Sequence, residues 1–409
     1  MKHLAIVPLI GGMAIGAENA LGVPPEAVLS YDGFWGNDKY LMAWYEKRGL
    51  DIPYYNLDSD TIPAFSEVDV VSSLCPCAGL TSANAHASAS CASNTWMLKS
   101  AQWAMEYARP RVIIGENASR LFTSFGQPIA TTMKKMADIW GYHLTLIKTD
   151  TKLHGLPQKR PRSFFVLYRK DDNRVPLLAL GGHTPYDGTW IDFLNTFPTD
   201  EAESERRWAF PEMYEFISEK MPNWAAGDPR GSGSVMETIF DNDWVDEFCD
   251  KYPGKEADRV VRAKNKFAMG LGVWDGTAKK TGDYFAAVNF RNSNEAVHPI
   301  RHDSPTWREL MRLMGLPETM DVPTENPNAI AQNVPTCTSE WIVKSAMDSL
   351  AGKNGYNSHE LKGDGILRQN NVNSQTRYGM EFGRHYAEHG MAHIELVRQS
   401  SKQLQPVLT

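Results

Sequence analysis

Short apolar runs alternate with amphipathic stretches over the first 170 residues of the chain. Six runs have the length and composition of β-strands, and several are apolar throughout, as strands buried on both faces of a parallel sheet are. They occupy residues 3–10, 26–32, 69–75, 111–117, 142–150 and 162–169. Residues 94–108 and 130–142 carry apolar side chains at helical spacing. This alternation predicts a doubly wound, Rossmann-like α/β sheet, in which ligands bind beyond the carboxyl ends of the strands.

The regularity is lost after residue 170, which indicates a change of domain. Residues 171–300 are rich in Trp, Gly, Pro and Asp and include the acidic run TDEAESE and the turn-rich run NWAAGDPRGSGS. We therefore expect a smaller, irregular domain there. Helical patterning returns within 301–351, which we expect to complete the first domain, and 352–409 is a polar C-terminal tail with little periodicity.

The composition is that of a folded protein, because 42% of the 409 residues are hydrophobic and 22% are charged. A net charge of −7 argues against a surface that binds nucleic acid everywhere, although it allows a local basic face. No apolar run approaches the roughly 20 residues of a membrane helix. The glycine pair in the N-terminal run favours a buried strand, turn and helix over a cleaved signal peptide. We expect a cytoplasmic protein without membrane contact.

A thiol at the carboxyl end of a predicted strand is the first candidate for chemistry. The strand at 69–75 runs into the segment CPCAGL, which contains Cys75 and Cys77, and small residues follow. A thiolate at such an edge is a competent nucleophile. The alternative is a pair of ordinary buried cysteines. Five cysteines without a second close pair predict neither a disulfide framework nor a zinc site.

Two further strand ends carry polar side chains. The strand at 111–117 ends in Glu116 and Asn117, and a carboxyl group there can exchange a proton with a bound ring nitrogen. Its alternative role is to cap a following helix. Arg160 and Arg162 precede a third strand and share one face, because side chains repeat every two residues. They could orient a carboxylate and a ligand carbonyl, or form a solvated strand face.

Taken in order, these segments resemble the DNA (cytosine-5-)-methyltransferase family. That family has a Pro-Cys loop, a Glu-Asn-Val strand end and a Gln-x-Arg-x-Arg segment, which correspond here to CPCAGL, GENA and QKRPR. TWRELMRLMGLP is similar to the family's Thr-x-Arg-Glu helix and its turn, and AQNVPTCTSEWIVKSAM to its Asn-Ala-Val-Pro element. Leu9 stands where the family's first cofactor-loop glycine would be, and Ala78 and Ala118 also depart from the pattern. The departures suggest a divergent, phage-like branch.

The resemblance implies a methyltransferase sheet, a target-recognition domain at 171–300 and covalent catalysis. Cys77 would attack C6 of cytosine, with Cys75 as the competing candidate. Glu116 would hydrogen-bond N3 and the exocyclic amine, Arg162 would hold O2, and Arg160 would brace the loop.

The resemblance also implies S-adenosylmethionine as the methyl donor. Its expected contacts are Leu9, Ile10, Gly11, Gly12, Asp60 for the adenine amine, Asn333, Val334, and either Asp32 or Asp38 for the ribose. We include Asp38 among the expected cofactor residues, but the irregular segment SYDGFWGND does not decide between the two.

The implied substrate is a cytosine flipped out of double-stranded DNA. The best basic cluster in the expected recognition domain comprises Arg259, Arg262, Lys264 and Lys266, followed by Lys279 and Lys280. These side chains suit phosphate contacts, and a solvated helix face is the alternative. Three rival functions remain: a tRNA cytosine methyltransferase, transfer of a bulkier group from a modified donor, and a catalytically silent DNA-binding protein.

Overall fold

The structure is a computed structural model of the 409-residue chain. It describes residues 1–371 apart from 78, 82–85, 92, 171–177, 179–184, 199–210, 223–234, 269–284, 287, 289–304 and 353–363. The side chains of 211, 214, 235–237, 266, 267 and 286 are also outside the description.

An eight-stranded sheet forms the centre of the molecule, with the order β10-β6-β8-β5-β4-β1-β2-β3. All neighbouring strands are parallel except β8, which runs antiparallel to both β5 and β6. The strands are β1 (His3–Ile6), β2 (Ala27–Ser30), β3 (Tyr54–Asn56), β4 (Val70–Leu74), β5 (Val112–Ala118), β6 (Tyr142–Asp150), β8 (Pro161–Arg169) and β10 (Ile366–Asn370). A separate parallel pair joins β7 (Gln158–Lys159) to β9 (Phe285–Ala286).

The predicted doubly wound sheet is confirmed, and each of the six apolar runs overlaps one of its strands. The first strand is shorter than its apolar run, because Val7 and Leu9 have positive φ angles of 48° and 53° and turn the chain out of the sheet. Two strands of this sheet were missed, as was the separate pair of β7 and β9. β3 is only three residues long and half-buried, and β10 lies in the segment predicted as a tail, where it adds an edge strand beside β6.

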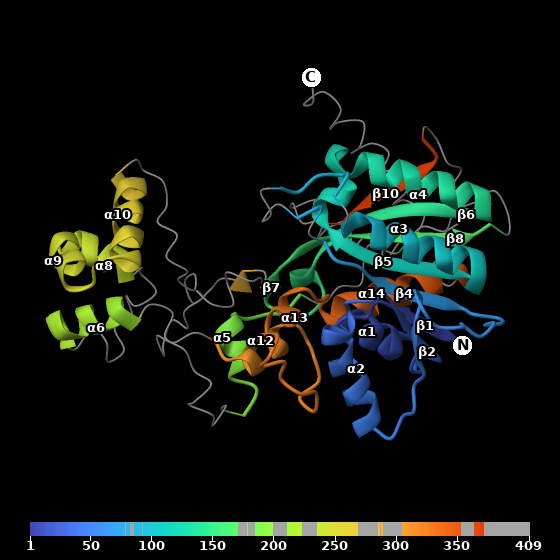
Figure 1. The fold of residues 1–409 in the computed structure, drawn as a ribbon, viewed down its shortest axis with the longest axis horizontal. Helices are drawn as coiled ribbons and strands as arrows, with labels where there is room; N and C mark the ends of the chain where they lie inside the picture. The colour runs from blue at the N-terminus through green and yellow to red at the C-terminus, as the bar shows by residue number, and fades with distance from the viewer. Residues whose placement is uncertain are drawn as a thin grey trace.

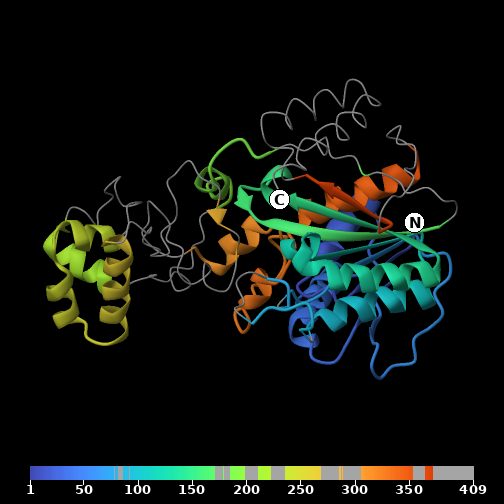
Figure 2. The same cartoon turned by 90° about the horizontal axis from the view of Figure 1, so that it is seen from above.

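Helices cover both faces of the sheet, as Figures 1 and 2 show. Helices α3 (Ser93–Trp103) and α4 (Gln127–Trp140) lie on one face, and a short π-helical turn, Ala104–Ala108, extends α3. On the other face α1 (Gly12–Leu21) packs along α14 (Thr336–Leu350). The C-terminal part of the described chain therefore covers the first βα unit of the fold.

Glycines allow α1 and α14 to approach closely. A Cβ atom added at Gly16 would overlap the Ser339 side chain and the Thr336 carbonyl oxygen. A Cβ added at Gly12 would overlap the carbonyl oxygen of Val334. The glycine-rich start of α1 is thus required by helix packing as well as by the turn that precedes it.

A second apolar cluster joins the sheet to helices from both ends of the chain. Ala5 and Val28 belong to it, while their strand neighbours Leu4 and Leu29 belong to the main core, as the two-residue period of a strand requires. Its other elements include α2 (Trp35–Lys47), α5 (Trp190–Leu194), α12 (Trp307–Leu313) and α13 (Asn328–Ala331).

The described part of 171–300 also contains a small helical cluster that the sequence pattern did not reveal. It consists of α6 (Pro211–Lys220), α8 (Val235–Asp241), α9 (Val245–Lys251) and α10 (Lys255–Ala268). The cluster has its own apolar core around Phe216, Ile239 and Phe248. Figures 1 and 2 show these helices apart from the sheet and its covering helices. Within the part of the chain that the structure describes, no helix is long and apolar enough to cross a membrane.

We expect Gly16→Ala to lower the free energy of unfolding by about 1–3 kcal/mol, because the added methyl group overpacks the contact between α1 and α14. Gly36→Ala is the matched control, because a Cβ at Gly36 meets no atom within 4 Å and that residue is also helical. The control should leave stability unchanged or raise it by about 0.5 kcal/mol. Urea unfolding of both variants makes the comparison, and equal losses would contradict the packing explanation.

Candidate active site

Three neighbouring strands bring the candidate catalytic residues to one edge of the sheet. Leu74, the last residue of β4, pairs with Glu116 on β5, and the chain continues from Leu74 into Cys75 and Cys77. On the other side of β5, Ala118 pairs with Arg162 at the beginning of the antiparallel strand β8. The start of β8 and the ends of β4 and β5 therefore meet. This geometry places a thiol-bearing loop, a carboxyl group and a guanidinium beside one another.

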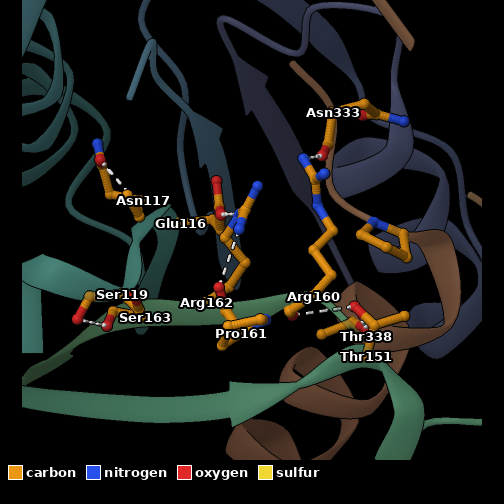
Figure 3. Close-up of polar contacts among 12 residues, drawn as sticks. Glu116, Asn117, Ser119, Thr151, Arg160, Pro161, Arg162, Ser163, Asn333 and Thr338 are labelled. Atoms are coloured by element: carbon orange, nitrogen blue, oxygen red, sulfur yellow. Dashed lines mark hydrogen bonds and ion pairs between the residues drawn. The ribbon is translucent and has the colours of Figure 1, made fainter. Parts of the chain in front are cut away.

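Glu116 and Arg162 form a buried ion pair. The distance between Arg162 Nε and Glu116 Oε1 is 2.8 Å, and the Glu116 residue is only 3% exposed (Figure 3). Burial raises the pKa of the Glu116 carboxyl above its ordinary value, while the charges of Arg162 and Arg160 partly oppose that change. The site thus holds a carboxyl group that binds a proton more readily than one in water.

The two candidate cysteines have different surroundings. Cys77 is half-buried, and its thiol lies within the electrostatic influence of Arg162, Glu116 and Arg160. Burial raises the pKa of this thiol, and the positive charge of Arg162 opposes the increase. The Cys77 carbonyl oxygen accepts hydrogen bonds from the N–H groups of Leu80 and Thr81, so a tight turn follows the thiol.

Cys75 instead is buried between two serine hydroxyl groups. It is 3% exposed, and its sulfur lies 3.6 Å from both the Ser73 and the Ser100 hydroxyl oxygens. Burial raises the pKa of the Cys75 thiol to about 11. Cys77 is less buried and lies near the positive charges of Arg162 and Arg160, which favour the thiolate, so it is the better candidate for a nucleophile.

Arg160 donates hydrogen bonds to backbone carbonyl oxygens of other segments, while its charge also acts on the Cys77 thiol, and its bracing role stays a prediction. Its Nη1 donates to the Val288 carbonyl oxygen at 2.6 Å. Its Nη2 donates to the carbonyl oxygens of Ala331 and Asn333, both at 2.7 Å (Figure 3). Burial lowers the pKa of this guanidinium to about 9. Arg160 therefore ties the start of β8 to two distant backbone segments.

Gln158, the first residue of the segment QKRPR, also binds Val288, together with a different backbone segment at Leu313. Its Oε1 accepts a hydrogen bond from the Val288 N–H at 3.1 Å, and its Nε2 donates to the Leu313 carbonyl oxygen at 2.7 Å. Arg160 and Gln158 thus hold both backbone groups of Val288. This residue follows β9, near the end of the expected recognition domain, so the two side chains attach that region to the catalytic sheet.

Asn333 continues this network to the glycine turn after β1. Its Oδ1 accepts a hydrogen bond from the Gly12 N–H at 2.8 Å, and the neighbouring Val334 is buried against the same turn. The structure thus joins the two segments that the resemblance assigns to the cofactor pocket. The Asn333 Nδ2 is buried and has no hydrogen-bond partner among the described residues. An acceptor atom on a bound ligand would satisfy that donor.

The turn itself has an unusual backbone. Val7, Leu9 and Gly11 all have positive φ angles, of 48°, 53° and 109°. A left-handed conformation costs a residue with a side chain about 1–2 kcal/mol, so the surrounding structure must hold Val7 and Leu9 in place. Leu9 and Ile10 are buried.

The two candidates for the ribose contact lie in different environments. Asp38 is 0% exposed, and the Tyr54 hydroxyl donates to its Oδ2 at 3.1 Å. Asp32 is exposed just beyond the end of β2, where Asn56 Nδ2 donates to its Oδ1 at 2.6 Å. The exposed Asp60 accepts a hydrogen bond from the Asn56 N–H at 2.7 Å. Asp32 and Asp60 thus share one polar edge, and Asp38 is beneath the surface.

The expected DNA-binding residues lie on α10, apart from the catalytic edge. Arg259 forms an ion pair with Glu256 at 3.2 Å, and Lys264 lies 3.8 Å from Asp243. Arg262 is exposed. The Lys266 side chain and residues Lys279 and Lys280 lie outside the described part of the structure. Acidic neighbours therefore offset part of the predicted basic face.

A comparison with known protein families identifies the family of this chain. The family model described as C-5 cytosine-specific DNA methylase matches residues 1–335, which include every candidate catalytic and cofactor residue. The chain belongs to the C-5 cytosine-specific DNA methylase family. The resemblance recognised in the sequence is thereby confirmed. A search of curated proteins found no match.

Solved structures of methyltransferases share the fold of this family member. An E. coli prophage-encoded protein, named as a candidate DNA modification methyltransferase, matches with a TM-score of 0.54 and 14% identity, over 86% of this chain and 99% of its own. The methyltransferase EhMeth of Entamoeba histolytica matches with a TM-score of 0.51 and 9% identity, over 86% and 98%. At these identities the likeness shows the fold. Among the described residues of this methylase-family chain, no group of three or more His, Cys, Asp or Glu side chains could hold a metal ion.

Alkylation of Cys77 by iodoacetamide tests the electrostatics of the site without substrate. We expect Arg162→Ala to slow the reaction at pH 8 by about threefold to tenfold, because losing the positive charge raises the pKa of the thiol further. Glu116→Gln should accelerate it, since a negative charge is removed. Mass spectrometry of the Cys77 peptide gives the rate, and Cys91 serves as an internal control. Changes in the same direction for both variants would contradict this electrostatic arrangement.

Proposed function

We propose that this protein transfers a methyl group from S-adenosylmethionine to C5 of a cytosine flipped out of double-stranded DNA, through a transient bond between Cys77 and C6. The observation that carries the proposal is the buried pair of Glu116 and Arg162 beside a half-buried thiol at the ends of β4 and β5. Membership of the C-5 cytosine-specific DNA methylase family supports both the reaction and DNA as substrate.

The chemistry requires a nucleophile because C5 of cytosine reacts poorly with a methyl donor. Addition of the Cys77 thiolate to C6 makes the ring an enamine with electron density at C5. After C5 takes the methyl group, loss of the C5 proton and departure of the thiolate restore the aromatic ring and the enzyme. Cys75 is poorly suited to this role because its thiol is buried between two serine hydroxyls.

Glu116 would act on the ring as charge develops there. Thiolate addition places negative charge on N3, and a carboxyl group with a raised pKa can donate its proton to that atom. Arg162 would hold the O2 oxygen of the base and keep Glu116 oriented through their ion pair. Arg160 would act indirectly, by fixing the backbone at Val288 and Asn333.

The residues at the glycine turn fit a nucleoside methyl donor. The exposed carboxylates of Asp32 and Asp60 can accept hydrogen bonds from ribose hydroxyls and an adenine amine, and the buried Asn333 Nδ2 needs an acceptor. We therefore assign the ribose contact to Asp32. Leu9 to Gly12 would contribute backbone groups, and Val334 would close the pocket. S-adenosylmethionine supplies the activated methyl group when it is bound there.

The region 171–300 would contact the DNA on either side of the flipped base. Base flipping is required because C5 and C6 are stacked within an intact duplex. Within the described helical cluster, Arg262 on α10 is exposed and suits a phosphate contact. The attachment at Val288 by Gln158 and Arg160 would keep this region in register with the catalytic edge.

Transfer of labelled methyl groups from S-adenosylmethionine to duplex DNA tests the proposal. We expect Cys77→Ser to lower the rate at least about a thousandfold, because the covalent step is lost. Cys75→Ser is the matched control and should retain most of the activity, since serine can keep the contacts with Ser73 and Ser100.

The reverse pattern in these two variants would overturn the assignment of the nucleophile. Transfer RNA is assayed in parallel with the duplex. Methylation of tRNA together with unmodified DNA would contradict the proposed substrate, and folded protein that methylates neither would contradict the proposed activity.

A further inference from the structure

One face of helix α3 contacts the chain on either side of the candidate nucleophile. Asn94, Met97 and Ser100 are spaced three residues apart on that face, and all three are buried. The Ser100 hydroxyl oxygen lies 3.6 Å from the sulfur of Cys75, and the Asn117 Nδ2 donates to the sulfur of Met97 at 3.5 Å. Two of the three residues therefore hold α3 against the ends of β4 and β5.

Asn94 makes the third contact, with the turn that follows Cys77. In that turn the Cys77 carbonyl oxygen accepts hydrogen bonds from the N–H groups of Leu80 and Thr81, and Gly79 lies between. A Cβ atom added at Gly79 would be 2.5 Å from Asn94 Oδ1 and 2.6 Å from Asn94 Nδ2. The flat amide group therefore packs directly on the backbone of Gly79, where there is no room for a larger residue.

Hydrogen bonds determine how this amide group is oriented. Asn94 Nδ2 donates to the carbonyl oxygens of Ser88 at 3.0 Å and Ala89 at 3.1 Å. Because a carbonyl oxygen only accepts, the amide nitrogen must face these two groups. The Oδ1 atom is buried and has no hydrogen-bond partner among the described residues. One side chain thus joins the turn after Cys77 to the backbone just before α3.

We propose that Asn94 is a positioning residue that holds the Cys77 thiol in place beside Glu116 and Arg162. The inference rests on the proposed function, because Cys77 is the proposed nucleophile. Asn94 acts through Gly79, two residues after the thiol, and not on the cytosine itself. A displacement of about 1 Å in a reacting group can cost about a hundredfold in rate, so the support of this turn affects the covalent step.

Transfer of labelled methyl groups to duplex DNA, at saturating DNA and S-adenosylmethionine, gives the direct test. We expect Asn94→Ala and Gly79→Ala each to lower kcat by about tenfold, because both disturb the turn, and to leave the KM for S-adenosylmethionine unchanged. The double variant should also lose about tenfold rather than about a hundredfold, since the added methyl group occupies the space that the amide group has left.

An isosteric variant separates the hydrogen bonds of Asn94 from its packing. Asn94→Asp keeps the shape, but its carboxylate cannot donate to the carbonyl oxygens of Ser88 and Ala89. It should lower kcat at least as much as Asn94→Ala, and it replaces that variant if the alanine protein does not fold. Thr95→Ala, at an exposed position of the same helix, is the matched control and should leave kcat unchanged. Isothermal titration with S-adenosylhomocysteine checks that each variant is folded.

Alkylation of Cys77 by iodoacetamide gives a second readout that needs no substrate. In the wild-type background, Arg162→Ala is expected to slow this reaction. In the Asn94→Ala background, Arg162→Ala should change the rate by less than about twofold, because the thiol no longer stays beside the guanidinium. A purely structural role for Asn94 would leave the effect of Arg162→Ala as large as before.

The possible failures can be told apart. Wild-type kcat in folded Asn94→Ala and Asn94→Asp would overturn the inference and leave the proposed function intact. A double variant that loses about a hundredfold, as independent sites would, or an undiminished effect of Arg162→Ala on alkylation, would also overturn it. Wild-type protein that methylates neither DNA nor tRNA would contradict the proposed function, whereas alkylation would still decide whether Asn94 holds the thiol.

Discussion

The ion pair between Glu116 and Arg162 is the interaction around which the catalytic edge is arranged. A carboxylate removed from water must be paired or protonated, and the 2.8 Å contact with Arg162 Nε supplies the partner. That contact exists because β8 runs antiparallel beside β5, which brings Arg162 from the start of one strand to the end of the other. The strand order thus determines the electrostatic surroundings of Cys77, whose thiol lies near both charges.

Hydrogen bonds from buried side chains to backbone groups connect this edge to the rest of the molecule. Arg160 and Gln158 hold Val288, and Arg160 also holds the carbonyl oxygen of Asn333. Asn333 in turn accepts a hydrogen bond from Gly12 at the turn after β1. Segments more than 100 residues apart in sequence therefore share one buried network. Such a network makes the positions of the start of β8, the glycine turn after β1 and the backbone at Val288 depend on one another.

The sequence predicted the parts of the fold that apolar runs encode. Six strands of the sheet have buried side chains on both faces, and their apolar composition made them recognisable as strands. By contrast, β3 is short and half-buried, and β10 is a polar edge strand with the sequence ILRQN, so neither has a clear pattern. The sequence of α10 does contain a helical pattern, because Val260 and Ala263 are three residues apart and both pack into the core of the helical cluster. The acidic and turn-rich runs around this segment obscured that pattern.

The sequence predicted which residues form the candidate site, but it did not predict most of the contacts that these residues make. The order of the motifs identified the family and selected Cys77, Glu116 and Arg162, whose catalytic roles stay predictions. The partners of Arg160 could not be read from sequence, because they are backbone carbonyls and have no side-chain signature. Asp38 shows the same limit. An acidic residue near the end of β2 suggests a ligand contact, and only its complete burial in the structure shows that it faces inward.

The proposed reaction depends on a transient bond between the sulfur of Cys77 and C6 of a cytosine in DNA. The most direct measurement uses duplex DNA with 5-fluorocytosine at the methylation site, because fluorine at C5 cannot leave as a proton does and so traps the adduct. With S-adenosylmethionine present, we expect a protein–DNA complex that survives denaturant, with the modified peptide containing Cys77. A duplex that binds and becomes methylated without such a complex, or an adduct on another residue, would contradict the account.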